Sequence, residues 1–472
     1  MPDIHYVCIS DTHFGADNSL LTNLGSGTGE VDPYRPSEVL LRFVECLRAL
    51  ISRNTGGARP TLVLNGDIFE FALRPDNFAA MAFQRFVELT MPPQPEARLF
   101  DPRIFFIPGN HDHHLWESAR EIQYSLYLQQ VPADTAIEAP WHTTEMLGGR
   151  DIESAFANAV IRRCPGLEDV KVITRYPNMA LYKGGKLVVF SHGHFTEEVY
   201  LMMTTVADAM FNRPPGRSSI DRWEQENFAW IDFFWSMLGR SGLVGQDVGL
   251  VYEKMQDAAR FGDLVGQAVR SLLEVYGSAR IKRFDRLIEC VVKSAVAGRL
   301  ERARPEKVLA DDGAGLRRYL QGPLRTCLEE EMPDGSRPEE VTFVFGHTHK
   351  PFEEDIAIEE FITPNVRLYN SGGWVVDRAA PQALFGGAVI LLDENLEAAS
   401  LRMYNEADKP AEYAVKVGSA GPHRPGSDSF REWIKTAVRS DLSPWADFSA
   451  AAAAGVNAHC QKLANLLADD RD

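Results

Sequence analysis

Five short apolar runs are spread through this chain, and a polar motif follows closely behind each of them. The runs cover residues 4–9, 61–64, 104–107, 187–190 and 342–345 and are mostly β-branched or aromatic. Runs of this length and composition predict buried strands. In chain order the polar motifs are Asp11-Thr12-His13, Gly66-Asp67, Gly109-Asn110-His111-Asp112, Ser191-His192-Gly193-His194 and Gly346-His347-Thr348-His349. The pattern predicts an α/β chain whose five motifs lie at the carboxyl ends of strands, where α/β sheets place their ligands.

The side chains in these motifs have the chemistry of metal ligands. Carboxylate, amide oxygen and neutral imidazole are hard and borderline donors for divalent cations. Two such cations about 3.5–4 Å apart clamp both the attacking and the leaving oxygen of an in-line displacement. The carboxylate of Asp67 has two oxygens and suits a bridge between two ions. A glycine before Asp67, Asn110 and His347 lets the backbone turn sharply and approach the ions closely. The residues therefore predict a dinuclear metal site.

The ordered set of motifs resembles the calcineurin-like metallophosphoesterase superfamily. The resemblance covers the strand-forming parts of residues 4–349 and the segment Leu368-Tyr369-Asn370-Ser371-Gly372-Gly373-Trp374. It implies a four-layer sandwich of two mixed β-sheets flanked by helices, whereas periodicity alone indicates only an α/β chain. It also implies hydrolysis of a phosphate mono- or diester by attack of a hydroxide that bridges two metal ions.

The resemblance implies a role for each polar residue that matches a motif of the family. Three residues would bind one metal ion, three would bind the other, and one aspartate would bridge them. They are Asp11, His13 and His349; Asn110, His192 and His347; and Asp67. Manganese is the first expectation for both ions, with iron or zinc as alternatives, because oxygen-rich mixed sites accept several metals.

The third and fourth motifs each carry a further polar residue beside the expected ligands. By the resemblance, His111 steadies the phosphoryl oxygens and protonates the leaving oxygen, and Asp112 orients His111. His194 is an alternative ligand to His192, which we favour because it comes first after the strand.

The substrate stays open between a phosphorylated small molecule and a lipid precursor. Three segments resemble the UDP-2,3-diacylglucosamine pyrophosphatase group, but the chain departs from its pattern at His111 and His194. The segments are Gly66-Asp67-Ile68-Phe69-Glu70, Gly346-His347-Thr348-His349-Lys350-Pro351 and Asn370-Ser371-Gly372-Gly373-Trp374. A nuclease of the same superfamily is a second alternative and would need a basic groove. A non-catalytic scaffold would lack ligands, and none is missing.

Composition limits the class of protein further. The net charge of −17 over 472 residues opposes stable nucleic-acid binding, which depends on neutralising many phosphates. No apolar run reaches the ~18 residues of a transmembrane span, and a strand begins too early to leave room for a signal peptide. The six cysteines lack C-x-x-C spacing, which favours reduced thiols and a cytoplasmic location. The oligomeric state is not predicted.

Three regions are expected. Residues 1–194 and 341–405 form the metallophosphoesterase domain, 195–340 an inserted all-helical cap beside the metals, and 406–472 a linker with a helical tail. Apolar residues at three- and four-residue steps predict helices within the cap and the tail. These helices cover residues 197–211, 219–238, 246–276, 278–300, 316–332, 429–438 and 448–467. The helix at 278–300 has a basic face, which either steers a phosphorylated substrate or lies in solvent. The last helix either docks on the domain or contacts another subunit.

Overall fold

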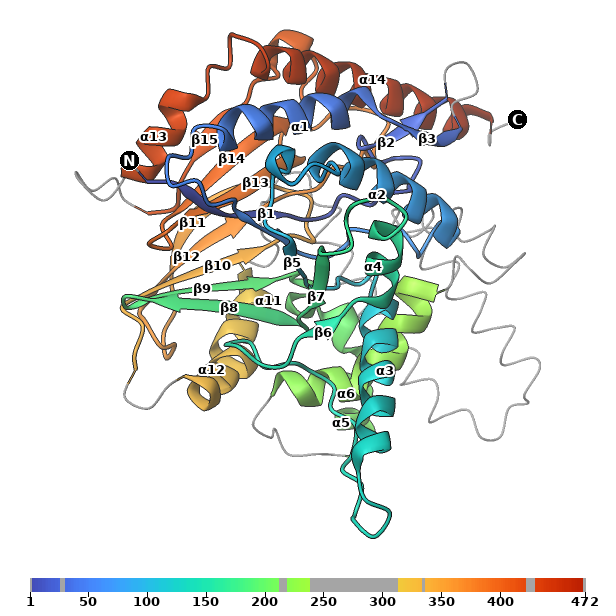
Figure 1. Ribbon diagram of the computed structural model, residues 1–472, viewed down its shortest axis with the longest axis vertical. Coiled ribbons are helices and arrows are strands. Elements are labelled where there is room, and N and C mark those ends of the chain that lie inside the picture. The colour runs from blue at the N-terminus through green and yellow to red at the C-terminus, as the bar shows by residue number, and fades with distance from the viewer. Residues whose placement is uncertain are drawn as a thin grey trace.

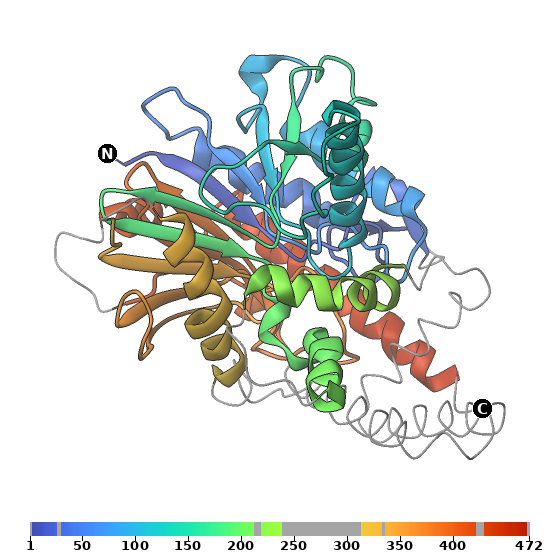
Figure 2. The same cartoon turned by 90° about the horizontal axis from the view of Figure 1, so that it is seen from below.

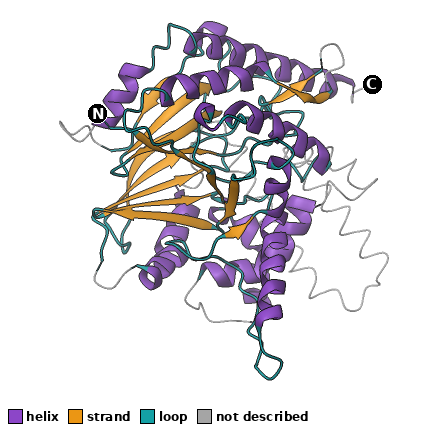
Figure 3. Cartoon of the chain, in the orientation of Figure 1, coloured by secondary structure: helices purple, strands orange, loops and turns teal. Residues whose placement is uncertain are grey.

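Two β-sheets lie face to face in the centre of the molecule, and helices cover their outer faces (Figure 1). The computed structural model describes residues 2–25, 30–211, 219–237, 313–332, 336–421 and 429–469. The same view coloured by secondary structure separates the strands from the helical layers above and below them (Figure 3). The four-layer α/β sandwich expected from the resemblance is confirmed.

The first sheet carries the strands of the first three motifs. Within the described residues its eight strands lie in the order β15-β14-β13-β1-β4-β5-β7-β6. Strands β1, β4, β5 and β7 are parallel, and β13 joins the other side of β1 antiparallel. In the sheet order, their bounds are Lys416–Gly418, Ala398–Asn405, Gly386–Asp393, Ile4–Ile9, Thr61–Leu64, Arg103–Phe106, Lys171–Thr174 and Ile152–Glu153.

The second sheet carries the strands of the fourth and fifth motifs. Its order is β11-β12-β10-β9-β8, in which β9, β10 and β12 are parallel and the outer two strands are antiparallel. The bounds in that order are Phe352–Ala357, Asn365–Asn370, Glu340–Phe345, Lys186–Ser191 and Asn178–Lys183. A separate short hairpin joins β2 (Thr22–Leu24) to β3 (Val31–Pro36).

Apolar side chains fill the space between the two sheets. Cys8, Val63 and Ile107 of the first sheet are buried against Phe190 and Val344 of the second. Because side chains of β1, β4, β9 and β10 and of Ile107, directly after β5, join this cluster, sheet packing fixes the strands relative to one another. The carboxyl ends of β1, β4, β5, β9 and β10 are therefore brought to a common edge.

Helices α1 (Glu38–Ile51), α2 (Asp76–Thr90), α4 (Ala155–Ile161), α13 (Ser429–Ala437) and α14 (Trp445–Asp469) cover the first sheet. The α1 helix starts where Ser37 accepts a hydrogen bond from Leu40 N, as an N-cap serine does. Its apolar face, which includes Phe43 and Leu47, is fully buried. Helix α14 packs on α1, so the predicted tail helix is docked on the domain.

The second sheet is covered by α11 (Ala314–Tyr319), η8 (Leu320–Leu324) and α12 (Arg325–Glu331). Their side chains, including Tyr319 and Leu324, belong to the cluster that contains Phe343 of β10. This part of the predicted cap is therefore the outer helical layer of the second sheet. The division of the chain into three regions remains a prediction.

Other helices lie near the edge of the sheets where the motifs meet. The helix expected at 197–211 forms η3 (Glu198–Leu201) and α5 (Met202–Phe211), and the one at 219–238 forms α6 (Ile220–Ile231) and the π-helical η4 (Asp232–Met237). The helices expected at 246–276 and 278–300, with the basic face, lie outside the described residues. The remaining elements are α3 (His114–Gln130), η1 (Pro95–Ala97), η2 (His194–Thr196) and η9 (Pro410–Glu412).

The expectations about membrane-spanning segments and about the cysteines can be compared with the described residues. None of their helices combines the length and the apolar character that crossing a membrane requires. The cysteines among them are free thiols, and all but the half-buried Cys327 are buried. Residue Cys290 lies outside the described part of the chain.

Candidate metal centre

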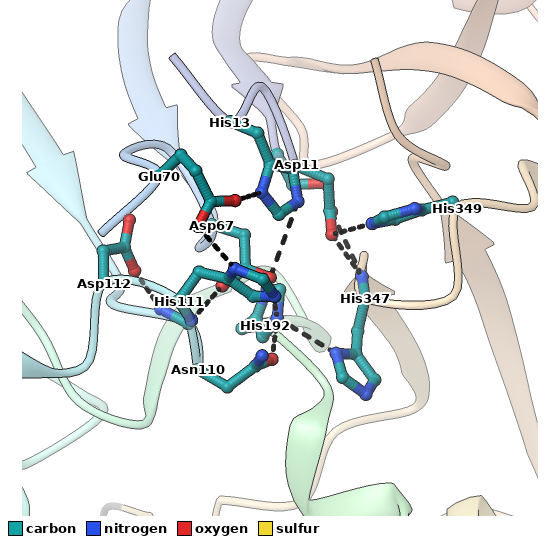
Figure 4. A network of polar contacts seen from close by, with 12 residues as sticks. Asp11, His13, Asp67, Glu70, Asn110, His111, Asp112, His192, His347 and His349 are labelled. Atoms are coloured by element: carbon teal, nitrogen blue, oxygen red, sulfur yellow. Dashed lines mark hydrogen bonds and ion pairs between the residues drawn. The ribbon is translucent and has the colours of Figure 1, made fainter. Parts of the chain in front are cut away.

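All five motifs converge at the shared edge of the two sheets (Figure 4). Backbone hydrogen bonds join neighbouring loops: Asp11 N donates to Gly66 O at 2.9 Å, and His13 N donates to Asp67 O at 3.0 Å. Gly346 N likewise donates to His192 O at 3.0 Å. The loops after β1, β4, β9 and β10 therefore hold one another in place.

The backbone at the expected ligands is in an unusual conformation. Seven described residues other than glycine have a positive φ, and five of them are expected ligands: Asp11, His13, Asp67, His347 and His349, with φ between 43° and 69°. This left-handed conformation costs about 1–3 kcal/mol at a residue with a side chain and persists where the surroundings impose it. Its concentration here indicates a functional site.

Each of the three glycines singled out in the motifs lies against a ligand side chain. A Cβ atom added at Gly66 would lie 2.3 Å from His192 Nδ1, and one at Gly109 would lie 2.3 Å from Asp67 Oδ1. A Cβ atom at Gly346 would lie 2.1 Å from Asp11 Oδ2. Any side chain at these positions would displace a ligand, so glycine is required for close approach.

The expected ligand atoms form two adjacent groups. In the first group, the ligand atoms of Asp11, His13 and His349 lie within 4.8 Å of one another. His349 Nε2 is 3.5 Å from Asp11 Oδ1. The bridging residue expected from the sequence, Asp67, lies beside this group, because its Oδ2 is 3.7 Å from His13 Nε2.

The same oxygen of Asp67 also touches the second group. Asp67 Oδ2 is 3.3 Å from His192 Nε2, which in turn lies 3.1 Å from Asn110 Oδ1 and 3.2 Å from His347 Nδ1. One carboxylate oxygen thus lies between the two groups of ligand atoms, as a bridge between two ions would require.

Each ligating imidazole expected from the sequence has a partner at its outward nitrogen. Glu70 Oε2 lies 2.9 Å from His13 Nδ1. Asn65 O lies 3.3 Å from His192 Nδ1, and Asp377 Oδ2 lies 3.2 Å from His349 Nδ1. Glu197 Oε1 lies 3.0 Å from His347 Nε2 as an ion-pair contact without hydrogen-bond geometry. Such partners fix the ring and its tautomer, so that the other nitrogen faces a metal ion.

Two buried atoms that face the centre of the site show whether its residues fit a metal ion. His13 Nε2 and Asp67 Oδ2 are buried, and neither has a hydrogen-bond partner among the described residues. Their separation of 3.7 Å is too long for a hydrogen bond. Buried polar atoms without partners are rare and costly, and a divalent cation between them satisfies both. These atoms therefore fit a divalent metal ion between them.

Imidazole side chains stabilise the negative charge of the carboxylate at the centre of the site. Burial acts to raise the pKa of Asp67, but the neighbouring His192 and His111 outweigh it and hold this pKa well below its ordinary value. Burial and the nearby charge of Asp67 instead raise the pKa of Asp112 to about 7. The ionised carboxylate at the bridging position is the form that binds cations.

His111 lies beside the two ligand groups, and a carboxylate contacts its ring. Glu70 Oε1 is 3.0 Å from His111 Nδ1. Asp112 accepts hydrogen bonds from three backbone amides, those of Ile68, Phe69 and Gly109, at 2.7, 3.1 and 2.6 Å. Asp112 thus braces the loops and Glu70 contacts the ring, and the role of Asp112 in orienting His111 remains a prediction.

The alternative ligands His192 and His194 differ in their position relative to the ligand groups. The His194 ring is buried and stacks on Tyr176, with Nε2 3.2 Å from the tyrosine hydroxyl. It belongs to neither ligand group, whereas His192 belongs to the second.

Three carboxylates beside the centre were not assigned a role from the sequence: Glu70, Glu197 and Asp377. Only Glu70 has a local signal, because it lies three residues after Asp67 within a quoted motif. The other two contact histidines that are distant in sequence, and no pattern in the chain indicates that contact. Trp374, by contrast, is buried against Phe43, as a packing residue.

Comparison with known proteins agrees with this geometry. The sequence profile of the family Calcineurin-like phosphoesterase matches residues 4–233, which include the first four motifs. No curated protein sequence matches the chain significantly. The fifth motif lies beyond the matched residues, yet its two histidines complete both ligand groups. Residues 4–233 therefore belong to the calcineurin-like phosphoesterase family.

Proposed function

We propose that this protein is a dinuclear-metal-dependent phosphoesterase that hydrolyses a phosphate mono- or diester of a small molecule or lipid precursor. Membership of the family implies a phosphoester hydrolase. The single observation that carries the dinuclear proposal is the position of Asp67 Oδ2, 3.7 Å from His13 Nε2 and 3.3 Å from His192 Nε2. An oxygen shared between two ligand groups supports two ions rather than one.

Seven side chains would hold the ions. Asp11, His13 and His349 would hold one, Asn110, His192 and His347 the other, and Asp67 both. When bound, two divalent cations lower the pKa of water and neutralise the charge that develops on the transferred phosphoryl group. The mixed oxygen and nitrogen donors favour manganese, with iron or zinc also accommodated.

His111 has the position of a catalytic residue beside these ligands. Its backbone N–H donates to Asp67 Oδ1 at 2.8 Å, which ties the third motif to the bridging carboxylate. Because Glu70 contacts Nδ1, the nitrogen that faces away from Glu70 is Nε2. We assign Nε2 the role of hydrogen-bonding the phosphoryl oxygens and of transferring a proton to the leaving oxygen.

The test is hydrolysis of an aryl phosphodiester and an aryl phosphomonoester by protein loaded with manganese, iron or zinc. We expect metal-dependent turnover that disappears on chelation. His111→Ala should reduce kcat by about 10²–10⁴-fold, the range for loss of a general acid, and leave two metal ions per chain. Binding of one ion per chain would overturn the dinuclear proposal, and full turnover by His111→Ala would overturn the role of His111.

A panel of natural substrates then separates the remaining classes. Nucleotides, phospholipid precursors, UDP-linked acyl sugars and oligonucleotides would be compared by kcat/KM under the same metal conditions. A preference for oligonucleotides would contradict the expectation from the net charge of −17.

A further inference from the structure

The segment that follows His111 is held by residues inserted between the fourth and fifth motifs. Helix α3 begins at His114, and η4 packs against it. Figure 2 shows α6 and its continuation lying beside α3. The insertion therefore reaches the loop of the third motif as well as the second sheet.

Ser236 of η4 joins two points of this loop. Its hydroxyl accepts a hydrogen bond from His114 N at 3.1 Å and donates one to His111 O at 3.2 Å. The side chain is fully buried, so water does not replace these bonds when they are lost. One hydroxyl thus fixes the carbonyl of the catalytic residue and the first amide of the helix behind it.

Two carboxylates of the insertion hold the intervening histidine. Glu224 Oε1 lies 2.8 Å from His113 Nε2, and Asp232 Oδ1 lies 3.7 Å from His113 Nδ1. Glu224 Oε2 also accepts a hydrogen bond from Tyr176 OH at 2.9 Å. Both Glu224 and His113 have 0 % exposure, which makes the contact a fixed part of the core rather than a surface pair.

We propose that the insertion is a positioning element of the active site, with Ser236 and Glu224 as positioning residues for the loop that carries His111. This inference rests on the proposed function, in which His111 acts on the substrate. An insertion that merely covered the domain would contact its surface side chains. Here it bonds to the backbone of His111 itself, and the ring orientation depends on that backbone.

The decisive variant is Ser236→Ala, which removes both hydrogen bonds and adds no bulk. The matched control is Thr205→Ala, since the Thr205 hydroxyl in the same insertion bonds to Leu201 O within its own helical segment. Misplacing a catalytic group by about 1 Å costs up to about 10²-fold in rate. We expect kcat of Ser236→Ala to fall about tenfold, with KM and metal content within twofold of the unmodified protein.

A second measurement does not depend on activity. Hydrogen–deuterium exchange followed by mass spectrometry reports the protection of the His114 amide and its neighbours. We expect faster exchange over residues 111–118 in Ser236→Ala and no change there in Thr205→Ala. Unchanged exchange in both variants would overturn the inference whatever the enzyme does.

The two proposals fail in different ways. If the unmodified protein shows no metal-dependent hydrolysis of any ester, the proposed function fails, and exchange still decides whether Ser236 holds the loop. If the unmodified protein is active and Ser236→Ala keeps its full kcat, the function stands and the positioning role is overturned. Equal loss of activity in Ser236→Ala and Thr205→Ala would also overturn it, because general weakening of the insertion would explain both.

Discussion

Glu70 and His111 are joined by a contact of 3.0 Å between Oε1 and Nδ1, and the other oxygen of the same carboxylate lies 2.9 Å from His13 Nδ1. One side chain therefore orients both a proposed metal ligand and the proposed proton donor. The carboxylate is almost fully buried, and although burial acts to raise its pKa, His111 and His13 hold that pKa below the ordinary value.

We predict that Glu70→Gln weakens metal binding and lowers the rate of hydrolysis at the same time. An amide has one acceptor oxygen and cannot accept from the two rings, so one imidazole loses its orientation. Loss of such a partner reduces metal affinity or activity by about 10–100-fold. Metal titration and kcat should both show the change. Glu88→Gln, at an exposed carboxylate paired with Arg85, should show neither.

A second prediction uses two adjacent glutamates of the insertion. Glu197 contacts His347 Nε2 at 3.0 Å, whereas Glu198 is exposed and pairs with Arg318. Glu197→Gln should weaken binding of the metal ion held by His347 by about 10–100-fold, because the imidazole loses its orienting carboxylate. Glu198→Gln should leave it unchanged. Metal content after dialysis measures both, and equal retention in the two variants would contradict the assignment.

A third prediction concerns close packing at the third motif. A methyl group at Gly109 would lie 2.3 Å from Asp67 Oδ1 and 2.6 Å from Asp67 N, so the bridging residue must move. We expect Gly109→Ala to lose metal and to destabilise the fold by about 1–3 kcal/mol, as overpacking does. Gly57→Ala is the control for metal content, because an added methyl group meets no atom within 4 Å there, although its φ of 72° strains any residue other than glycine. Metal content should be normal in the control.

A fourth prediction concerns pH. Burial acts to lower the pKa of His113, but Glu224 and Asp232 outweigh it and raise this pKa to about 10 from its ordinary value of 6.5. A raised pKa stabilises the folded state fully below about pH 6.5, and this contribution is lost as the pH rises towards 10. Removing one partner of a buried ion pair costs about 3–5 kcal/mol. The destabilisation caused by His113→Gln should therefore be large at pH 6 and shrink at pH 10.

Urea unfolding of both proteins at the two pH values gives this difference directly. Other groups titrate in both proteins and cancel in the comparison. A difference in unfolding free energy that does not depend on pH would show that the imidazolium does not form.

A fifth prediction concerns metal removal. A ligand that binds only the folded protein stabilises it by about 2.7 kcal/mol at a concentration of 100 Kd. Thermal unfolding should therefore occur at lower temperature after chelation and recover when manganese is added. An identical Tm with and without metal would contradict binding at the buried ligand groups.

The clustering of the candidate ligands was predictable from the sequence because each of them lies next to the end of a strand. The residues of a motif are local, and strand ends meet at one edge once the sheets form. The partners of the ligands were not predictable in the same way. Asp377 reaches His349 only after the chain has formed β11 and β12, and Glu197 reaches His347 from the turn between η2 and η3.

The helices were likewise predictable from local spacing, whereas the residues that they pack against were not. Spacing of apolar residues predicted helices at 316–332 and 219–238, and both regions are helical. It gave no information about their partners, because an apolar face does not specify what it packs on. Tyr319 and Leu324 pack against the second sheet instead of forming a core of their own. The roles of Ser236 and Glu224 likewise depend on contacts with residues more than 100 positions away.

The position of β1 between β4 and β13 has a consequence for how the molecule assembles. Tyr6 pairs with Thr61 on one side and with Leu392 on the other. Pairing over such long separations in sequence closes slowly, because the loop entropy is lost before the contacts form. While the chain is being synthesised, β1, which precedes the loop with Asp11 and His13, has one open edge until residues 386–393 leave the ribosome. Unpaired edges recruit foreign strands. The nascent protein is therefore most vulnerable to aggregation in the interval before its last central strand arrives.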